Sequence, residues 1–462
     1  MKLSGLVLVG LAPVLTTLSA PALTGCSGGG SGGGTGGGKS GGGTGGGGST
    51  SEFFTLTTLD PDARDTVVFA AAVDADDRIG AVYFTPNGIE DPVGVPNYDL
   101  KYVEFRNGTV STPERLRSVQ RMVGLSLAFD PLSKEPVVAF LGGAAGFMPG
   151  DSIFWFQSDA AIMRRLSSTG LWRETDIAIV SAPPACSSID QGFLPGLWPT
   201  VGFNAAGRMF VVFRDGHNGQ FPQQDWASSD VELMTGASET ALVRSCLTGD
   251  HKQAYGGRLQ VAIGEGDLPA IVYDQAFGGA DTIGNNVLFQ RMLPDAGWSA
   301  PAALLNIADT MTGATLAYHP MEGFGIAVTD RATSQLSYIK SATGASWTVI
   351  DPVFGSGTGG WYPSLAMDPI NEGEPAIAFY VCSARAGVTA TSCLQTEDEL
   401  RITQRIGGNW QERTVDTEGG WAPKLKFLSS GKRAVVYRTP AALDSTGRVS
   451  STAGVLKLAV EK

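Results

Sequence analysis

The hydrophobic and polar positions after residue 51 follow one repeated pattern. A short apolar strand leads into a turn rich in Asp, Gly or Pro, and a second apolar strand follows, as in VVFAAAVDADDRIGAVYF around Asp74. Apolar runs of this length, bounded by turn residues, predict antiparallel strand pairs. The unit occurs seven times in all, and its later turns lie at Asp130, Asn204, Gly264, His319, Asp368 and Leu428.

A second hairpin follows each strand pair, and a Gly-bearing turn within it precedes a tryptophan. The segments LSYIKSATGASWTVID, LRITQRIGGNWQERTVD and VLFQRMLPDAGWSAPAAL place Trp347, Trp410 and Trp298 after this turn, and Trp172 has the same place in an earlier unit. The copies recur about every 59 residues, which leaves room for four strands and their loops. We expect these four tryptophans to serve packing.

Four-stranded units repeated seven times predict an all-β, seven-bladed β-propeller, because a closed ring packs neighbouring blades together and leaves few exposed strand edges. After the seventh strand pair only the strand Val455 to Val460 remains, so the last blade lacks its outermost strand. The segment FFTLTTLD, from Phe53 to Asp60, resembles the missing piece. We therefore expect this N-terminal strand to complete the last blade. Six or eight blades, or an open solenoid, are the alternatives.

The first 25 residues read as a secretory signal that precedes Cys26. Lys2 is the only early charge, and an apolar run from Leu3 to Leu23 follows it. Pro13 and Pro21 interrupt this run, which favours a cleaved signal over a retained membrane helix. The residues Leu23, Thr24, Gly25 and Cys26 resemble the lipobox of bacterial lipoproteins, in which the cysteine is acylated. Cleavage after Ala22 and a structural cysteine are the competing interpretations.

The resemblance to a lipoprotein also implies a location. Ser27 follows the cysteine where an Asp would favour the inner membrane, so the outer membrane of a bacterium with two membranes is implied. Residues 26–50 are almost entirely Gly, Ser and Thr, and we expect a disordered tether that spans roughly 25 to 30 Å. The predicted domains are thus residues 1–25, a signal peptide, 26–50, a lipidated linker, and 51–462, the propeller.

Composition narrows the range of partners. The formal net charge is -12, which argues against nucleic acid and against binding to anionic lipid except through acyl chains. We expect a monomer with no cofactor. Four cysteines besides Cys26 suggest two disulfides, of which Cys382 with Cys393 is favoured by its short loop and leaves Cys186 with Cys246. A metal site is the alternative, but the spacing lacks close pairs and nearby histidines, so no metal is expected.

The placing of Gly and Trp on the outer hairpins resembles that of Asp-box propellers, the group that includes sialidases. Ser341, Thr343, Gly344 and Trp347 keep part of that motif, while Asp295, Gly297 and Trp298 have a different spacing. The resemblance covers the whole domain as architecture. The catalytic residues of sialidases, an arginine triad and a Tyr with a carboxylate, find no matching positions, so their activity is not carried over.

Candidate binding residues gather where the longer loops leave the ring. Strand direction alternates, so the loops between second and third strands and those between blades emerge on one end, which we call the loop-rich end, and the tight turns emerge on the other. Loops on such scaffolds commonly bind ligands. The candidates, which are aromatic, cationic or imidazole side chains, are Trp155, His217, Trp226, Trp198, Trp361, Trp421, Arg214 and Arg331. Packing beneath neighbouring loops is the alternative role for Trp198, Trp361 and Trp421.

Carboxylates at the ends of second strands offer an alternative, catalytic role. Two of Asp215, Asp274 and Asp330 at about 5 to 10 Å from each other could act as acid and base on a glycosidic bond. Such residues more often cap loops or form ion pairs. The sequence therefore predicts a lipid-anchored propeller that binds a glycan or protein ligand without catalysis, with a sialidase-like glycoside hydrolase and a structural surface scaffold as alternatives.

Overall fold

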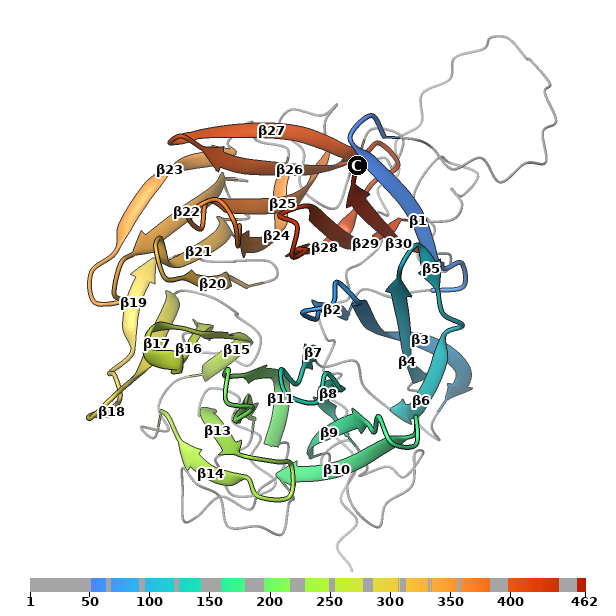
Figure 1. Cartoon of the computed structure of the whole chain (residues 1–462). Helices are drawn as coiled ribbons and strands as arrows, with labels where there is room; N and C mark the ends of the chain where they lie inside the picture. The colour runs from blue at the N-terminus through green and yellow to red at the C-terminus, as the bar shows by residue number, and fades with distance from the viewer. Residues whose placement is uncertain are drawn as a thin grey trace, which may run out of the picture.

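The computed structural model shows a ring of seven β-sheets around a central axis (Figure 1). The structure describes residues 51–63, 68–90, 96–119, 124–142, 159–178, 195–216, 229–248, 254–276, 286–305, 307, 313–330, 333, 335–354, 359–382, 398–439 and 455–462. The predicted signal, Cys26 and the Gly-rich segment lie outside these residues. Among the described residues no helix is long and apolar enough to cross a membrane.

Each sheet is one blade, and its strands run antiparallel from the axis outward. Blade 1 holds β2 (Phe69–Val73), β3 (Ile79–Glu90), β4 (Pro96–Arg106), β5 (Thr109–Val110) and β6 (Glu114–Val119). Blade 2 holds β7 (Leu125–Phe129), β8 (Pro136–Leu141), β9 (Ala160–Arg165) and β10 (Trp172–Ala178). Blade 3 holds β11 (Pro195–Phe203), β12 (Met209–Asp215), β13 (Asp230–Gly236) and β14 (Val243–Cys246).

The second half of the ring repeats this order. Blade 4 holds β15 (Ala254–Ile263), β16 (Pro269–Ala276), β17 (Asn286–Leu293), β18 (Gly297–Trp298) and β19 (Ala302–Leu305), with the 3-10 helix η2 (Glu265–Asp267) in its first turn. Blade 5 holds β20 (Thr315–His319), β21 (Gly323–Asp330), β22 (Gln335–Ser341) and β23 (Thr348–Phe354). Blade 6 holds β24 (Gly359–Met367), β25 (Pro375–Cys382), β26 (Asp398–Ile406) and β27 (Asn409–Asp416).

Blade 7 closes the ring with strands from both ends of the chain. It holds β28 (Trp421–Phe427), β29 (Arg433–Thr439), β30 (Val455–Glu461) and, on the outside, β1 (Phe54–Asp60). β1 pairs with β30 in antiparallel register, from Phe54 opposite Glu461 to Asp60 opposite Leu456. The predicted seven-bladed ring and its closure by the N-terminal strand are confirmed.

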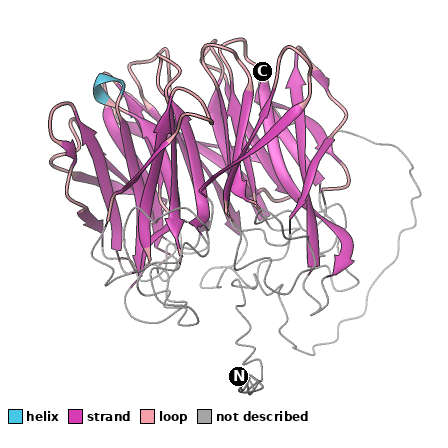
Figure 2. Cartoon of the chain, turned by 90° about the horizontal axis from the view of Figure 1, so that it is seen from below, coloured by secondary structure: helices cyan, strands magenta, loops and turns pink. Residues whose placement is uncertain are grey.

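The short turns of the blades all emerge at one end of the ring, which we call the tight-turn end (Figure 2). They join first to second strands and third to fourth strands, as the sequence predicts. The chain ends there too, and it enters the domain beside its own C-terminus, because Lys462 Nζ donates to the carbonyl oxygens of Ser51 at 2.8 Å and Glu52 at 3.2 Å.

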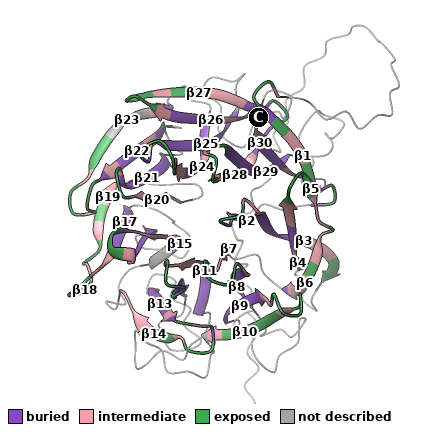
Figure 3. Ribbon diagram, viewed as in Figure 1, coloured by how far each residue is buried: buried purple, intermediate pink, exposed green. Residues whose placement is uncertain are grey.

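Seven clusters of the hydrophobic core each lie between two neighbouring blades. Buried residues therefore fill the inner strands, and exposure concentrates on the outer ones (Figure 3). The outer-hairpin tryptophans belong to these clusters. Trp172 packs edge-on against Tyr102 at 4.9 Å between ring centroids, Trp347 against Phe289 at 4.7 Å and Trp410 against Tyr338 at 5.5 Å. Each joins a fourth strand to the preceding blade, in the predicted packing role.

The turn that resembles an Asp box keeps its hydrogen bonding with a hydroxyl group. The amide of Gly344 donates to Ser341 Oγ at 2.8 Å, and Gly344 takes φ +80°, a conformation that favours glycine. Trp347 can thereby reach the neighbouring blade three residues later. The partial motif thus acts in the architecture of the hairpin.

A belt of hydrogen bonds links the innermost strands, which contact one another around the ring. In each case a polar side chain on one blade accepts from a backbone amide on the next. The bonds run from Val201 to Ser126 Oγ (3.1 Å), Val261 to Thr200 Oγ1 (3.3 Å), Leu316 to Gln260 Oε1 (3.3 Å), Leu365 to Thr315 Oγ1 (3.2 Å) and Leu425 to Ser364 Oγ (2.9 Å). These residues define one equivalent position per blade, which we call the belt position.

Candidate functional site

Four innermost strands bend where they begin, at the loop-rich end of the ring. A residue with positive φ lies at each bend, namely Trp198 (47°), Arg258 (53°), Tyr362 (56°) and Ala422 (50°). The strand register shifts at the same points. Such bulges redirect side chains and occur often beside functional sites. The bends therefore set the directions in which the side chains of Trp198, Trp361 and Trp421 point. Each of these tryptophans lies within two residues of a Pro.

An aromatic cluster joins blades 6 and 7 at this end. Trp361 lies beside Tyr380 on the neighbouring strand, with 5.8 Å between ring centroids. Tyr362 and Trp421 each approach Tyr380 at 6.3 Å. Trp361 and Tyr380 are buried, whereas Tyr362 and Trp421 are half-buried. The buried Trp361 side chain thus packs against its neighbours, which was the alternative role for it. Part of the Trp421 side chain reaches the surface.

Two arginines stack on tryptophans in the same way in blades 3 and 7. The guanidinium carbon of Arg214 lies 5.4 Å from the ring centroid of Trp198, and that of Arg438 lies 5.3 Å from Trp421. Both arginines are buried. Burial lowers the pKa of Arg214 to about 10, although the neighbouring charge of Asp215 opposes this shift. Arg214 therefore remains cationic near neutral pH, and both guanidinium groups lie over the adjacent rings in cation–π contact.

The candidate catalytic carboxylates are engaged within their blades. Asp215 Oδ2 lies 3.5 Å from Arg244 Nη2, and the same guanidinium contacts Glu232 at 2.5 Å. Asp274 Oδ2 lies 3.6 Å from Arg258 Nη1. All three carboxylates are buried. A cation so close favours the ionised carboxylate, whereas a general acid in glycoside hydrolysis must carry a proton.

Asp330 is the one remaining candidate within the described residues. Asp330 is half-buried and accepts a hydrogen bond from the Thr333 hydroxyl at 3.0 Å. Trp155, His217, Trp226 and Arg331 lie outside the described residues. Among the described residues, no group of three or more potential His, Cys, Asp or Glu ligands forms a metal cluster.

The pairing of the cysteines in disulfides stays a prediction. Cys246 is disulfide-bonded at the end of β14. Its predicted partner Cys186 lies outside the described residues, as do Cys393 and the side chain of Cys382.

The sequence did not indicate Tyr362, Tyr380, Arg244 or Arg258 as parts of this region. Tyr362 and Arg258 hold the positive-φ position of their repeat, which Trp198 and Ala422 hold in other blades. Aligning the copies at the belt position would have shown this equivalence. Arg244 gave no such signal, because its contacts with Asp215 and Glu232 depend on the pairing of β12, β13 and β14 in one sheet.

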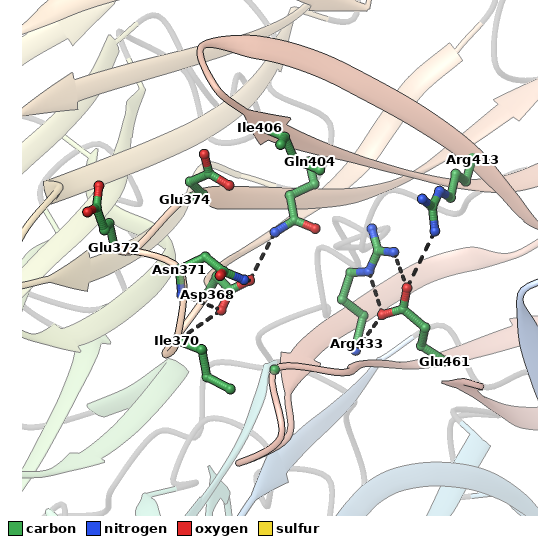
Figure 4. A pocket seen from close by; sticks show the side chains of 11 residues that line it. Asp368, Ile370, Asn371, Glu372, Glu374, Gln404, Ile406, Arg413, Arg433 and Glu461 are labelled. Atoms are coloured by element: carbon green, nitrogen blue, oxygen red, sulfur yellow. Dashed lines mark hydrogen bonds and ion pairs between the residues drawn. The ribbon is translucent and has the colours of Figure 1, made fainter.

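A polar cavity of about 640 Å³ lies between blades 6 and 7 at the tight-turn end (Figure 4). Asp368 accepts from the Ile370 amide at 2.9 Å and from Gln404 Nε2 at 3.0 Å. Although burial opposes the shift, hydrogen bonds from Asn371 and Gln404 hold the pKa of Asp368 below its usual range.

Across the same cavity Glu461 pairs with Arg433 and, at 3.5 Å, with Arg413. These charged and polar groups bond to one another. We therefore assign them to the contact between the two blades.

Comparisons with known proteins identify the fold alone. No family model and no curated protein matches the chain. Among solved structures, a polysaccharide lyase described as an ulvan lyase matches with a TM-score of 0.52 and 12% identity, over 87% of this chain and 95% of that one. A protein of unknown function from Dyadobacter fermentans matches with a TM-score of 0.48 and 11% identity, over 88% and 99%.

The NanB sialidase of Streptococcus pneumoniae matches with a TM-score of 0.44 and 10% identity, over 89% of this chain and 71% of that one. The structural neighbours thus include β-propeller glycoside hydrolases and lyases, all at low identity. At such identity the likeness shows a common architecture and leaves the activity of this chain to be argued from its own residues.

Proposed function

We propose that this protein is a lipid-anchored propeller of the cell envelope that binds a glycan at its loop-rich end without catalysis. The observation that carries the proposal is the pairing of half-buried Trp198 and Trp421 with buried arginines at the bends of the inner strands. Aromatic rings of this kind stack on sugar faces, and the arginines hold them in place. Trp155, Trp226, His217 and Arg331 remain sequence-based candidates for this site, outside the described residues.

Binding is favoured over hydrolysis because the buried carboxylates already have cationic partners. Asp215 and Asp274 each lie within 3.6 Å of an arginine. A pair of carboxylates that acts on a glycosidic bond needs one protonated member and access to the substrate. Neither requirement is met by two fully buried, ion-paired side chains.

The entry point of the chain suits an anchored role. Ser51 lies beside Lys462 at the tight-turn end, opposite the proposed binding end. A tether from Cys26 to Ser51 would therefore leave the loop-rich end facing away from the membrane. Metabolic labelling with an alkyne fatty acid, lost on Cys26→Ser, tests the anchor. Label retained by Cys26→Ser, or absent from the parent, would refute it.

A glycan array probed with the full chain tests the binding proposal. We expect binding to a restricted set of glycans, weakened at least tenfold by Trp421→Ala and by Trp198→Ala. Tyr318→Ala, which changes a half-buried aromatic residue at the tight-turn end, is the matched control and should bind as the parent does.

Three other outcomes would decide against the proposal. Absence of glycan binding together with capture of a defined protein ligand would indicate a protein-binding module. Release of a chromophore from aryl glycosides, lost on Asp215→Asn or Asp274→Asn, would indicate a hydrolase. Inactivity in every assay would leave a structural scaffold.

A further inference from the structure

The closing blade departs from the other six at two positions on its innermost strand. The belt position holds Ala70, Ser126, Thr200, Gln260, Thr315 and Ser364 in blades 1 to 6, and Lys424 in blade 7. Two residues further on, the same six blades hold Ala72, Ala128, Gly202, Ala262, Ala317 and Ala366, and blade 7 holds Lys426. Six small residues and one lysine thus surround the axis at one level.

Both lysines point toward blade 1, whose corresponding residues are alanines. Lys424 Nζ lies 5.6 Å from the ring centroid of Phe69 on β2. Leu425, between the two lysines, packs toward blade 6 instead, and so the alternation of the strand sends its neighbours to the other face. Blade 1 turns Phe69 and Ala71 toward blade 7, whereas Ala70 and Ala72 face blade 2.

Neither lysine has an anionic partner in the described part of the chain. No carboxylate there lies within 4.0 Å of either Nζ atom, although both side chains are half-buried. Burial, with repulsion from Lys426, lowers the pKa of Lys424 to about 8, and burial also lowers the pKa of Lys426. An anion stabilises a half-buried cation more than it stabilises an exposed lysine, because the surroundings screen the attraction less.

A cavity of about 420 Å³ at the tight-turn end of the axis contains Lys426. Its other lining residues are almost all apolar, with Leu127 and Phe129 from blade 2, Phe203 from blade 3 and Phe427 from blade 7. Lys426 is the single charged residue of this lining. The cavity therefore places one cation beside several apolar side chains, an arrangement that can receive a carboxylate on a small apolar body.

We propose that this axial cavity binds a small organic monoanion, with the carboxylate at Lys426 and the apolar body against Phe129, Phe203 and Phe427. The site lies at the opposite end of the ring from the proposed glycan site and does not depend on it. Lys424 adds a second positive charge at the adjoining belt position, toward the middle of the ring.

Calorimetric titration of the full chain with benzoate tests the proposal, and benzamide serves as the neutral ligand of the same shape. We expect benzoate to bind and benzamide to bind at least tenfold more weakly. Lys426→Ala installs the residue that five other blades carry, and it should weaken benzoate at least tenfold. Lys426→Arg keeps the charge and should retain binding within about threefold of the parent.

Lys432→Ala is the matched control, because this exposed lysine lies in the turn between β28 and β29 and should leave benzoate binding unchanged. Lys426→Met keeps the length of the side chain without its charge, and it replaces the alanine variant if that protein does not fold. Equal affinity for benzoate and benzamide, undiminished binding in the uncharged variants, or no binding by the parent at tens of millimolar benzoate would each overturn the proposal.

Discussion

The hydroxyl group of Tyr83 donates a hydrogen bond of 2.6 Å to Asp60, the last residue of β1. An equivalent bond of 2.6 Å runs from Tyr437 to Asp416, the last residue of β27. The strand from the N-terminus therefore meets the next blade as an internal fourth strand does. Burial, and then the hydrogen bond and charge of Asp60, raise the pKa of Tyr83 far above its usual range.

Removing the acceptor should destabilise the closing joint. Asp60→Ala leaves a buried tyrosine hydroxyl without its partner, and we expect it to lower the free energy of unfolding by about 2 kcal/mol. Tyr83→Phe, which removes the donor, should cost about 1 kcal/mol. Urea unfolding of both variants and of the double variant measures these terms. Fully additive losses would mean that the two residues do not act as a pair.

The belt should contribute measurably to stability at each bond. Thr315→Val keeps the shape of the side chain but leaves the amide of Leu365 without its acceptor. We expect a loss of about 1 to 2 kcal/mol in the free energy of unfolding, measured by urea denaturation. Thr348→Val, on the exposed outer strand of the same blade, is the control and should change stability little. Equal losses in both variants would show that the belt hydrogen bond does not contribute to the free energy of unfolding.

The ion pairs beneath the loop-rich end should be sensitive to loss of their cation. Arg244→Met leaves Glu232 and Asp215 buried without that guanidinium, and we expect a loss of about 3 to 5 kcal/mol. Arg208→Met, which removes an exposed arginine from the same blade, should cost less than about 1 kcal/mol. Thermal and urea unfolding compare the two. Adding Glu232→Gln to Arg244→Met should recover part of the loss.

Lys424 should make stability depend on pH in the alkaline range. Its pKa is about 8 in the folded protein and about 10.4 in an unfolded chain, so the unfolded state binds more protons between these values. Stability therefore rises from pH 8 to about pH 10.4, on the order of 3 kcal/mol, and this term is constant below pH 8 and above pH 10.4.

Urea midpoints measured from pH 7 to pH 10.5 for the parent and Lys424→Met isolate this term, since other titrating groups are common to both. The stability difference between them should shrink as the pH rises. Lys432→Met, at an exposed position, should follow the parent throughout. A constant difference between the parent and Lys424→Met would contradict the prediction.

Much of the architecture could be predicted from the repeat. Seven copies of one strand pair, the glycines and tryptophans of the outer hairpins, and the Leu-Asp ending of β1 are local patterns that recur at fixed places. The site could be predicted less well, because burial depends on neighbouring blades. Trp361 and Trp421 have the same sequence context, yet Tyr380 covers the first more than the second.

The two lysines of β28 could not be predicted as a site for a different reason. Their residue types are ordinary, and they become distinctive only when all seven strands are compared at one level of the ring. The comparison needs the register of each first strand with its second strand, and in several blades bulges shift that register. A pattern of apolar and turn residues locates the strands without fixing this alignment.

The position of Ser51 has a mechanical consequence for the closing strand. A load applied there along the ring axis pulls β1 lengthwise past β30, with Phe54 and Asp60 at the two ends of the paired segment. The interstrand hydrogen bonds lie across the strands, so they share such a load and resist it together. A sideways load would instead peel β1 away one bond at a time. The ring is thus held most firmly against tension along its axis, between Ser51 and the loop-rich end.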